Sequence, residues 1–164
     1  MTDIATLSAR LGEALLARGW RLATAESCTG GAVAAAITDI AGSSQWFDRG
    51  FVTYSNRAKQ EMLGVRAETL QRYGAVSEAT VREMVSGAIA RSGVETALAI
   101  SGIAGPGGGT PEKPVGTVCF AWATACGGPL TRTVLLSGDR LAVRAASVVT
   151  ALQGLLDEIT RSRG

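Results

Sequence analysis

The chain has 164 residues, of which 46% are hydrophobic and 18% are charged, and its formal net charge is +2. This size and composition are typical of one compact domain with a packed core, so we expect a single domain over residues 1–164. Charges of both signs are interspersed and aromatic residues are few, which argues against a nucleic-acid partner but leaves small anionic ligands open. No apolar run reaches membrane length, and the N-terminus lacks a signal-peptide pattern, so we expect no membrane association.

Cysteine and histidine usage narrows the chemistry further. Three cysteines without metal-ligand spacing fit reduced thiols in a cytoplasmic protein better than a disulfide framework. The chain contains no histidine, which excludes a Ser-His-Asp triad. The carboxylates at Asp39, Asp48 and Asp139 are scattered without ligand spacing, so we expect no metal site.

Helical and strand patterns alternate along the chain, with glycine or a capping residue at most boundaries. The predicted elements, in order, are a helix over 4–18, a strand over 20–25, an alanine-rich helix from about 32 to 41, a short strand within 42–59, helices over 55–63, 67–73 and 77–90, a strand over 95–101, strands over 115–124 and 130–137 that form a hairpin, and a final helix from about 138 to 159.

This order predicts an α/β fold, a three-layer α/β/α arrangement with a mixed, mainly parallel sheet and a late antiparallel hairpin. In such sheets ligands bind outside the carboxyl ends of the strands. The turns at 26–31, 55–59 and 101–110 should all emerge there. We therefore expect a site where these three turns meet.

The turn at 26–31 contains hydroxyl groups and glycines directly before a helix. Free backbone N–H groups at a helix N-terminus bind anions, so Ser27, Thr29 and Gly30 are candidate contacts for a phosphate. The alternative is that Ser27 or Thr29 only caps the helix. Cys28 is interpreted as a small buried side chain and not as a nucleophile, because no histidine is present to form a thiolate pair.

The stretch 42–59 combines two serines, a tyrosine and a lysine around a short strand. Lys59 is one of two lysines against fourteen arginines. A desolvated lysine can release its proton at usable pH whereas an arginine cannot, so Lys59 is a candidate base. The alternative is a solvated helix residue.

The segment 101–114 contains five glycines and three prolines in fourteen residues. Loops of this length in small domains are usually functional or disordered, and this one can fold over a ligand. Arg140 stands at the start of the last helix, where the helix dipole disfavours a cation. Either an anionic ligand or a salt bridge to an acidic residue explains it.

Six segments together match one family. The sequence resembles the CinA C-terminal domain family, and in its stand-alone form the bacterial nicotinamide-nucleotide amidohydrolases, over nearly the whole chain. The matching segments are residues 25–31, 41–44, 54–56 with Lys59, 74–77, 101–106 and 113–118.

The resemblance implies hydrolysis of the carboxamide of nicotinamide mononucleotide to the acid and ammonia, without a metal or organic cofactor. It implies Ser44 as the nucleophile, with Tyr54 and Lys59 as the activating pair. Ser101 stands where some relatives have threonine and retains the hydroxyl. The predicted substrate contacts are Ser27, Thr29, Gly30, Ser101, Gly102 and Arg140, with Arg144 as the alternative to Arg140 for the phosphate.

Chain geometry leaves one question open. Ser44 and Tyr54 are ten residues apart, about 33 Å if the chain were fully extended. Either residues 43–48 fold back or a second subunit completes the site, and we expect a homo-oligomer, with a dimer favoured. The rival functions are a nucleotide-binding module without chemistry and an amidase for a different small amide.

Overall fold

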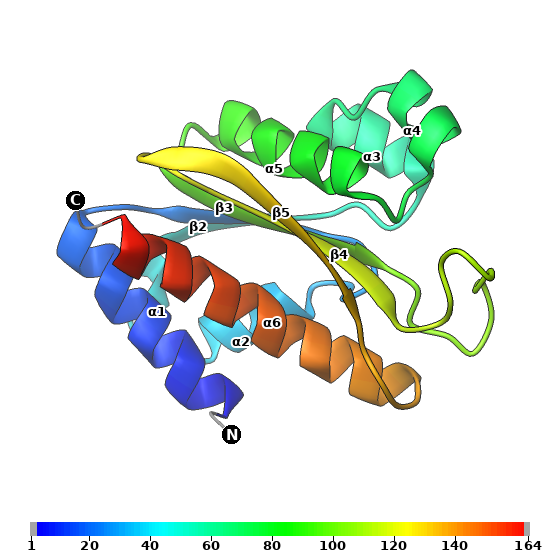
Figure 1. The fold of residues 1–164 in the computed structure, drawn as a ribbon. Helices are drawn as coiled ribbons and strands as arrows, with labels where there is room; N and C mark the ends of the chain where they lie inside the picture. The colour runs from blue at the N-terminus through cyan, green and yellow to red at the C-terminus, as the bar shows by residue number, and fades with distance from the viewer. Residues whose placement is uncertain (1–2, 163–164) are drawn as a thin grey trace.

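The computed structural model describes residues 3–162 as a five-stranded sheet between two layers of helices (Figure 1). The elements in order are α1 (Ile4–Arg18), β1 (Leu22–Glu26), α2 (Ala32–Thr38), the 3₁₀ turn η1 (Ser43–Gln45), β2 (Phe47–Val52), α3 (Asn56–Leu63), α4 (Ala67–Tyr73), α5 (Glu78–Ser92), β3 (Thr96–Gly102), β4 (Thr117–Thr124), β5 (Gly127–Leu135) and α6 (Arg140–Arg161).

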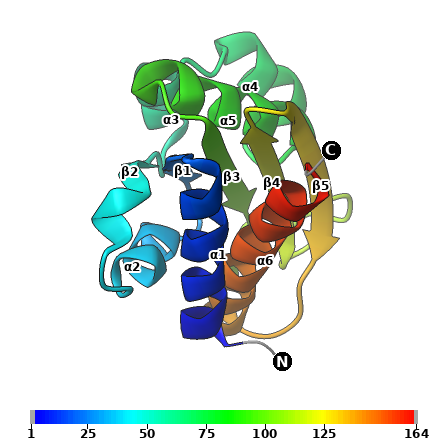
Figure 2. The same cartoon turned by 90° about the vertical axis from the view of Figure 1, so that its left-hand side faces the viewer.

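The strand order is β2-β1-β3-β4-β5. Strand β1 is parallel to both β2 and β3, and β4 is antiparallel to both β3 and β5, so only β4 runs against the other four strands. Helices α1, α2 and α6 cover one face, and α3, α4 and α5 lie on the other (Figure 2). This confirms the predicted three-layer α/β fold with a mixed sheet and a late hairpin.

Local signals account for most of the helix ends. Asp3 caps α1, because its side chain accepts from the N–H of Thr6, and Gly19 ends the helix with a φ of 67°. Ser55 caps α3 in the same way, and Gly64 ends it. The hairpin turn is shorter than predicted, because Gly127 already pairs with Thr124.

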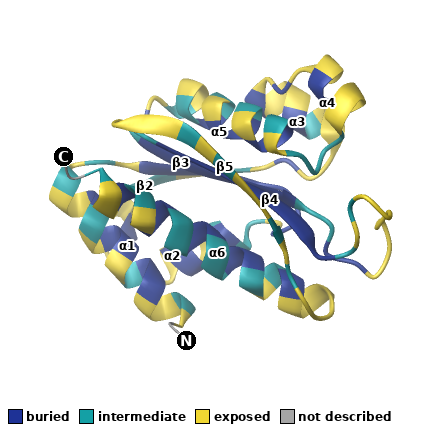
Figure 3. Ribbon diagram, in the orientation of Figure 1, coloured by how far each residue is buried: buried dark blue, intermediate teal, exposed yellow. Residues whose placement is uncertain are grey.

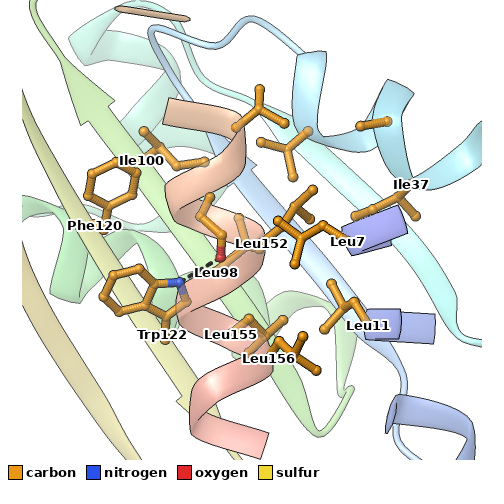
Figure 4. Packing of buried hydrophobic residues seen from close by; sticks show 14 of the residues in the cluster. Leu7, Leu11, Ile37, Leu98, Ile100, Phe120, Trp122, Leu152, Leu155 and Leu156 are labelled. Atoms are coloured by element: carbon orange, nitrogen blue, oxygen red, sulfur yellow. Dashed lines mark hydrogen bonds between the residues drawn. The ribbon is translucent and has the colours of Figure 1, made fainter. Parts of the chain in front are cut away.

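The two faces of the sheet differ in the size of their side chains. Large buried residues face α1, α2 and α6 (Figure 4), whereas alanines line the face toward α5, so that this helix can approach the strands closely. Strands β3 and β4 are buried between the two helical layers (Figure 3). The large residues include Leu98, Ile100, Phe120 and Trp122; the alanines are Ala23, Ala25, Ala97, Ala99, Ala121 and Ala123.

Trp122 is the largest side chain between β4 and α6. Its indole N–H donates to the carbonyl of Ala151 at 2.9 Å (Figure 4). Gly154 lies one turn further along α6, and a Cβ atom there would lie 2.2 Å from the indole Cζ2. This glycine therefore makes room for the tryptophan.

We expect Gly154→Ala to lower the free energy of unfolding by about 1–3 kcal/mol, because the overlap with Trp122 outweighs the better helix propensity of alanine. Urea denaturation measures the change. Ala145→Gly, at an exposed position of α6, is the control for helix propensity alone. A gain in stability for Gly154→Ala would show that the helix accommodates the methyl group without strain.

No helix in the described part of the chain is long and apolar enough to cross a membrane. The three cysteines are free; Cys28 and Cys119 are buried and Cys126 is exposed.

Candidate functional site

A cavity of about 260 Å³ opens at the carboxyl ends of β1 and β3. Its walls come from the turn after β1, the segment after β2 with α3, residues 75–76, the end of β3 with the loop that follows it, and the start of α6. Six predicted site residues line it together: Ser27, Tyr54, Lys59, Ser101, Gly102 and Arg140. The three turns that were expected to meet there do so.

Lys59 lies at the bottom of this cavity and is only 1% exposed. Its Nζ donates to Ser27 Oγ at 2.9 Å, to the carbonyl of Thr53 at 2.9 Å and to the carbonyl of Tyr54 at 3.3 Å. No carboxylate forms a salt bridge with it among the described residues. Burial lowers the pKa of Lys59 to about 8, and the nearby Cys28 opposes this only in part.

Ser27 is the hydroxyl that Lys59 contacts. It directly follows β1 and is 7% exposed. Its backbone N–H donates to the carbonyl of Ile100 in β3 at 3.0 Å, and its carbonyl accepts from the N–H of Gly30 at 3.0 Å. Two neighbouring elements thus fix the backbone of Ser27, and its contact with Lys59 has the geometry that a nucleophile and its base require.

Ser44 lies elsewhere. It is exposed in η1, before the start of β2, whereas Tyr54 follows the end of that strand. A six-residue strand spans roughly 17 Å at about 3.3 Å per residue, so β2 separates Ser44 from the cavity. The predicted trio of Ser44, Tyr54 and Lys59 is therefore not assembled within one chain. The expected helical turn does occur within residues 43–48, as η1, but it lies before β2 and does not bring Ser44 to Tyr54 at the other end of that strand.

Tyr54 contributes different groups to its two neighbours. Its backbone carbonyl accepts from Lys59, whereas its hydroxyl accepts from Arg140 Nη2 at 3.0 Å. The phenol therefore does not form the predicted activating pair with the lysine. It belongs to the mouth of the cavity.

Arg140 begins α6, which Asp139 caps by accepting from the N–H of Ala142. The Nη1 of Arg140 donates to the carbonyl of Gly105 at 2.8 Å, and Arg140 makes no salt bridge among the described residues. Arg144 instead donates to the carbonyls of Cys28 and Thr29, at 3.1 and 3.0 Å, and holds the turn after β1. Of the two arginines, Arg140 is the one that lines the cavity.

In the turn at 26–31, a carboxylate of the protein occupies the position at the N-terminus of α2 where a phosphate was predicted. Glu26 is fully buried and accepts from the N–H groups of Gly31, Val33 and Ala34 at 3.0–3.1 Å. The hydroxyl of Thr29 donates to the same carboxylate at 2.7 Å. These bonds satisfy the free N–H groups of α2.

Thr29 and Gly30 thus shape the turn and are absent from the cavity wall. Gly30 adopts a φ of 58°, a conformation that favours glycine. The sequence reasoning overlooked Glu26. An acidic residue that ends a buried strand just before a helix start was the signal for it.

We expect Glu26→Gln to lower the free energy of unfolding by about 2–3 kcal/mol. Both carboxylate oxygens of Glu26 accept from backbone N–H groups, and in glutamine an NH₂ group, which cannot accept, would replace one of these oxygens. Urea denaturation measures this, with Glu13→Gln at an exposed position of α1 as the matched control. Equal stability of the two variants would contradict the capping role.

Ser101 and Gly102 form the end of β3 and line the same cavity as Ser27 and Lys59. A Cβ atom on Gly102 would lie 2.7 Å from a methyl group of Val118, so close packing requires glycine there. The loop that follows contributes Gly105, Gly107 and Gly108 to the wall. Part of segment 101–114 thus folds against the site.

Cys28 is buried beside Ser27, and burial raises the pKa of its thiol to about 11. The side chain is therefore neutral at ordinary pH and a poor nucleophile, in agreement with the sequence interpretation. Its backbone N–H donates to no backbone carbonyl within residues 3–162. No group of three or more potential metal ligands occurs in that same part of the chain.

The geometry defines a serine-lysine site on an α/β scaffold. Comparisons with known proteins show the family to which the chain belongs. The family described as "CinA C-terminal domain" matches residues 4–159, and the chain belongs to this family. It is 57% identical over 164 residues, 99% of each chain, to the nicotinamide-nucleotide amidohydrolase PncC of Escherichia coli strain K12. It is 56% identical to the protein of the same name from Enterobacter agglomerans, over 95% of each chain.

Solved structures agree with this membership. A competence damage-inducible protein A from Klebsiella pneumoniae is 46% identical, with a TM-score of 0.93 over 97% of this chain and 98% of that one. The competence/damage inducible protein CihA from Agrobacterium tumefaciens has the same identity and TM-score over 98% and 97%.

Proposed function

We propose that the chain hydrolyses the carboxamide of nicotinamide mononucleotide to nicotinate mononucleotide and ammonia. One observation carries the chemical part of this proposal: the Nζ of a buried lysine, which has no carboxylate partner among the described residues, lies 2.9 Å from Ser27 Oγ in a cavity. The substrate is taken from the names of the relatives that are 56–57% identical over nearly the whole chain.

In the proposed reaction, Ser27 is the nucleophile and Lys59 is the base. With its amine uncharged, Lys59 accepts the hydroxyl proton while Ser27 Oγ attacks the carboxamide carbon. The backbone N–H of Cys28, the residue after the nucleophile, has no backbone carbonyl as acceptor and stabilises the oxyanion. Lys59 then returns the proton to the leaving nitrogen, and ammonia departs.

The second half of the reaction repeats these roles with water. Lys59 takes a proton from a water molecule, whose oxygen attacks the ester carbon on Ser27. Collapse of this intermediate releases the carboxylic acid and restores the serine hydroxyl. The sum is one amide and one water converted to one acid and one ammonia, without a metal or an organic cofactor.

We place the substrate phosphate near Arg140, at the mouth of the cavity. Its guanidinium lacks a carboxylate partner among the described residues and is held by neutral oxygens only, so an anion can still neutralise it. Ser101 and Gly102 are proposed to contact the nicotinamide end, because they line the same cavity and directly follow Ile100, whose carbonyl accepts from the N–H of Ser27.

The buried lysine also favours an enzyme over a nucleotide-binding module without chemistry. Removing an ammonium group from water without an opposite charge is costly. A site that only binds a nucleotide gains little from such a group, whereas catalysis gains a base with a pKa of about 8. Polar arrangements of this kind persist where function depends on them.

The test is the release of ammonia from nicotinamide mononucleotide by the purified protein, beside a panel of other small amides and after exhaustive treatment with EDTA. We expect turnover of the nucleotide, little turnover of the other amides and no effect of EDTA. If the protein hydrolysed another amide faster than nicotinamide mononucleotide, that amide would be the substrate instead. Loss of activity that an added divalent ion restores would contradict the metal-free mechanism.

A homo-oligomer, with a dimer favoured, and a cytoplasmic location remain part of the proposal. The three free cysteines are in keeping with a reducing compartment. Sedimentation analysis measures the oligomeric state, and a monomer at working concentration would contradict it.

A further inference from the structure

Tyr54 is held at both ends and yet remains open to solvent. Its carbonyl is 3.3 Å from Lys59 Nζ, and its hydroxyl is 3.0 Å from Arg140 Nη2. The guanidinium is itself held by the carbonyl of Gly105. The aromatic side chain therefore extends from the serine-lysine pair to Arg140, and 60% of its surface is exposed.

Tyr54 forms no aromatic or cation–π pair with a described residue. The cation–π pairs of the described chain are Arg18 with Trp20, Arg72 with Tyr73 and Arg132 with Trp122, so Arg140 meets Tyr54 at its hydroxyl and not over its face. The exposed part of this aromatic ring contributes little to the stability of the fold. A flat ligand in the cavity mouth would use it.

The residues that line the cavity include no aspartate or glutamate. A positively charged ligand ring therefore finds no carboxylate there. The negative face of an aromatic ring attracts such a cation, as do backbone carbonyls. Among the residues of the wall, Tyr54 provides the only such face.

We propose that Tyr54 stacks against the pyridinium ring of the substrate and selects pyridine carboxamides that are substituted, and hence positively charged, at the ring nitrogen. This rests on the proposed function, which places the carboxamide at Ser27 and the phosphate at Arg140. The ring and ribose that join these two groups then lie along Tyr54. Tyr54 is a specificity-determining residue and not part of the proton relay.

The test compares two ligands that differ in ring charge. Nicotinamide mononucleotide carries a cationic ring, whereas its reduced dihydropyridine form keeps the carboxamide, ribose and phosphate on an uncharged ring. Dissociation constants are measured by calorimetry with Ser27→Ala protein, so that no turnover interferes. Tyr54→Phe and Tyr54→Leu are added to this background, and circular dichroism verifies the fold.

We expect the charged form to bind about tenfold more tightly than the reduced form when residue 54 is tyrosine or phenylalanine. Tyr54→Leu should reduce this ratio to about one, mainly by weakening the charged form. An unchanged ratio in Tyr54→Leu would overturn the proposal. An equal loss of the ratio in Tyr54→Phe would assign the effect to the hydroxyl bond with Arg140 and would also overturn it.

This readout is separate from that of the proposed function. Binding that follows residue 54 without ammonia release from wild-type protein would leave the Tyr54 proposal standing and would refute the hydrolase. Ammonia release from wild-type protein, with a ratio of the two dissociation constants that does not depend on residue 54, would support the hydrolase and refute the Tyr54 proposal. Failure of both forms to bind, together with no ammonia release from wild-type protein, would refute both.

Discussion

Ser27→Ala is expected to reduce ammonia release by about three orders of magnitude or more, because removing a nucleophile that acts together with its base eliminates the covalent route. Affinity for the nucleotide should change little, since the hydroxyl contributes to the chemical step more than to ground-state binding. Steady-state kinetics and calorimetry measure the two quantities. Circular dichroism verifies that the fold is intact.

Ser44→Ala is the matched control for this experiment. Ser44 is exposed on η1, at the far end of β2, so we expect turnover close to that of the unmodified protein. A large loss in Ser44→Ala with normal turnover in Ser27→Ala would return the nucleophile to Ser44. The site would then have to be completed by a second copy of the chain.

Lys59→Arg and Lys59→Met should both lose most turnover. An arginine keeps the positive charge but stays protonated throughout the accessible pH range, so it cannot accept the proton of Ser27. A methionine fills the space of the lysine without a base. Substantial turnover by Lys59→Arg would show that residue 59 acts as a fixed charge.

The same lysine should determine how activity depends on pH. Its pKa of about 8 means that the reactive free amine is the minor form at pH 7. We therefore expect kcat/KM to rise about tenfold per pH unit below pH 8 and to level off above it. Residual activity of Lys59→Met should lack this rise. A flat profile of the unmodified protein between pH 6 and 9 would contradict the role of Lys59 as the base.

Much of the secondary structure could be predicted because its signals are local. The helix after Ser55 ends at Leu63 as predicted, since a side-chain cap and a glycine lie within one turn of its two ends. The helix α4, over Ala67–Tyr73, also has its predicted bounds. Strand ends were less accurate: β5 begins at Gly127 instead of 130, because pairing with β4 continues through two glycines that looked like a loop.

In the candidate site, too, local features could be predicted from the sequence and contacts between distant residues could not. Lys59 was recognisable as a base from residue type, and its burial fits that reading. Its partner was not recognisable, because Ser27 is 32 residues away in sequence and becomes its neighbour only when β1 and β2 pair side by side. The phosphate prediction for 26–31 did not foresee that Glu26 accepts from the N–H groups of α2, because a helix N-terminus has the same sequence pattern whether a ligand or a side chain of the protein occupies it.

The sequence by itself determined the α/β class, the helices with their caps and the cluster of turns at the carboxyl ends of the strands, because these depend on side-chain periodicity and on residues a few positions apart. The tertiary structure alone decided which serine meets Lys59, which arginine faces the cavity and where Tyr54 points. These depend on strand order and register, which bring together groups that are 27 to 116 residues apart along the chain. Burial, which sets the pKa of Lys59, also exists only once those layers have packed.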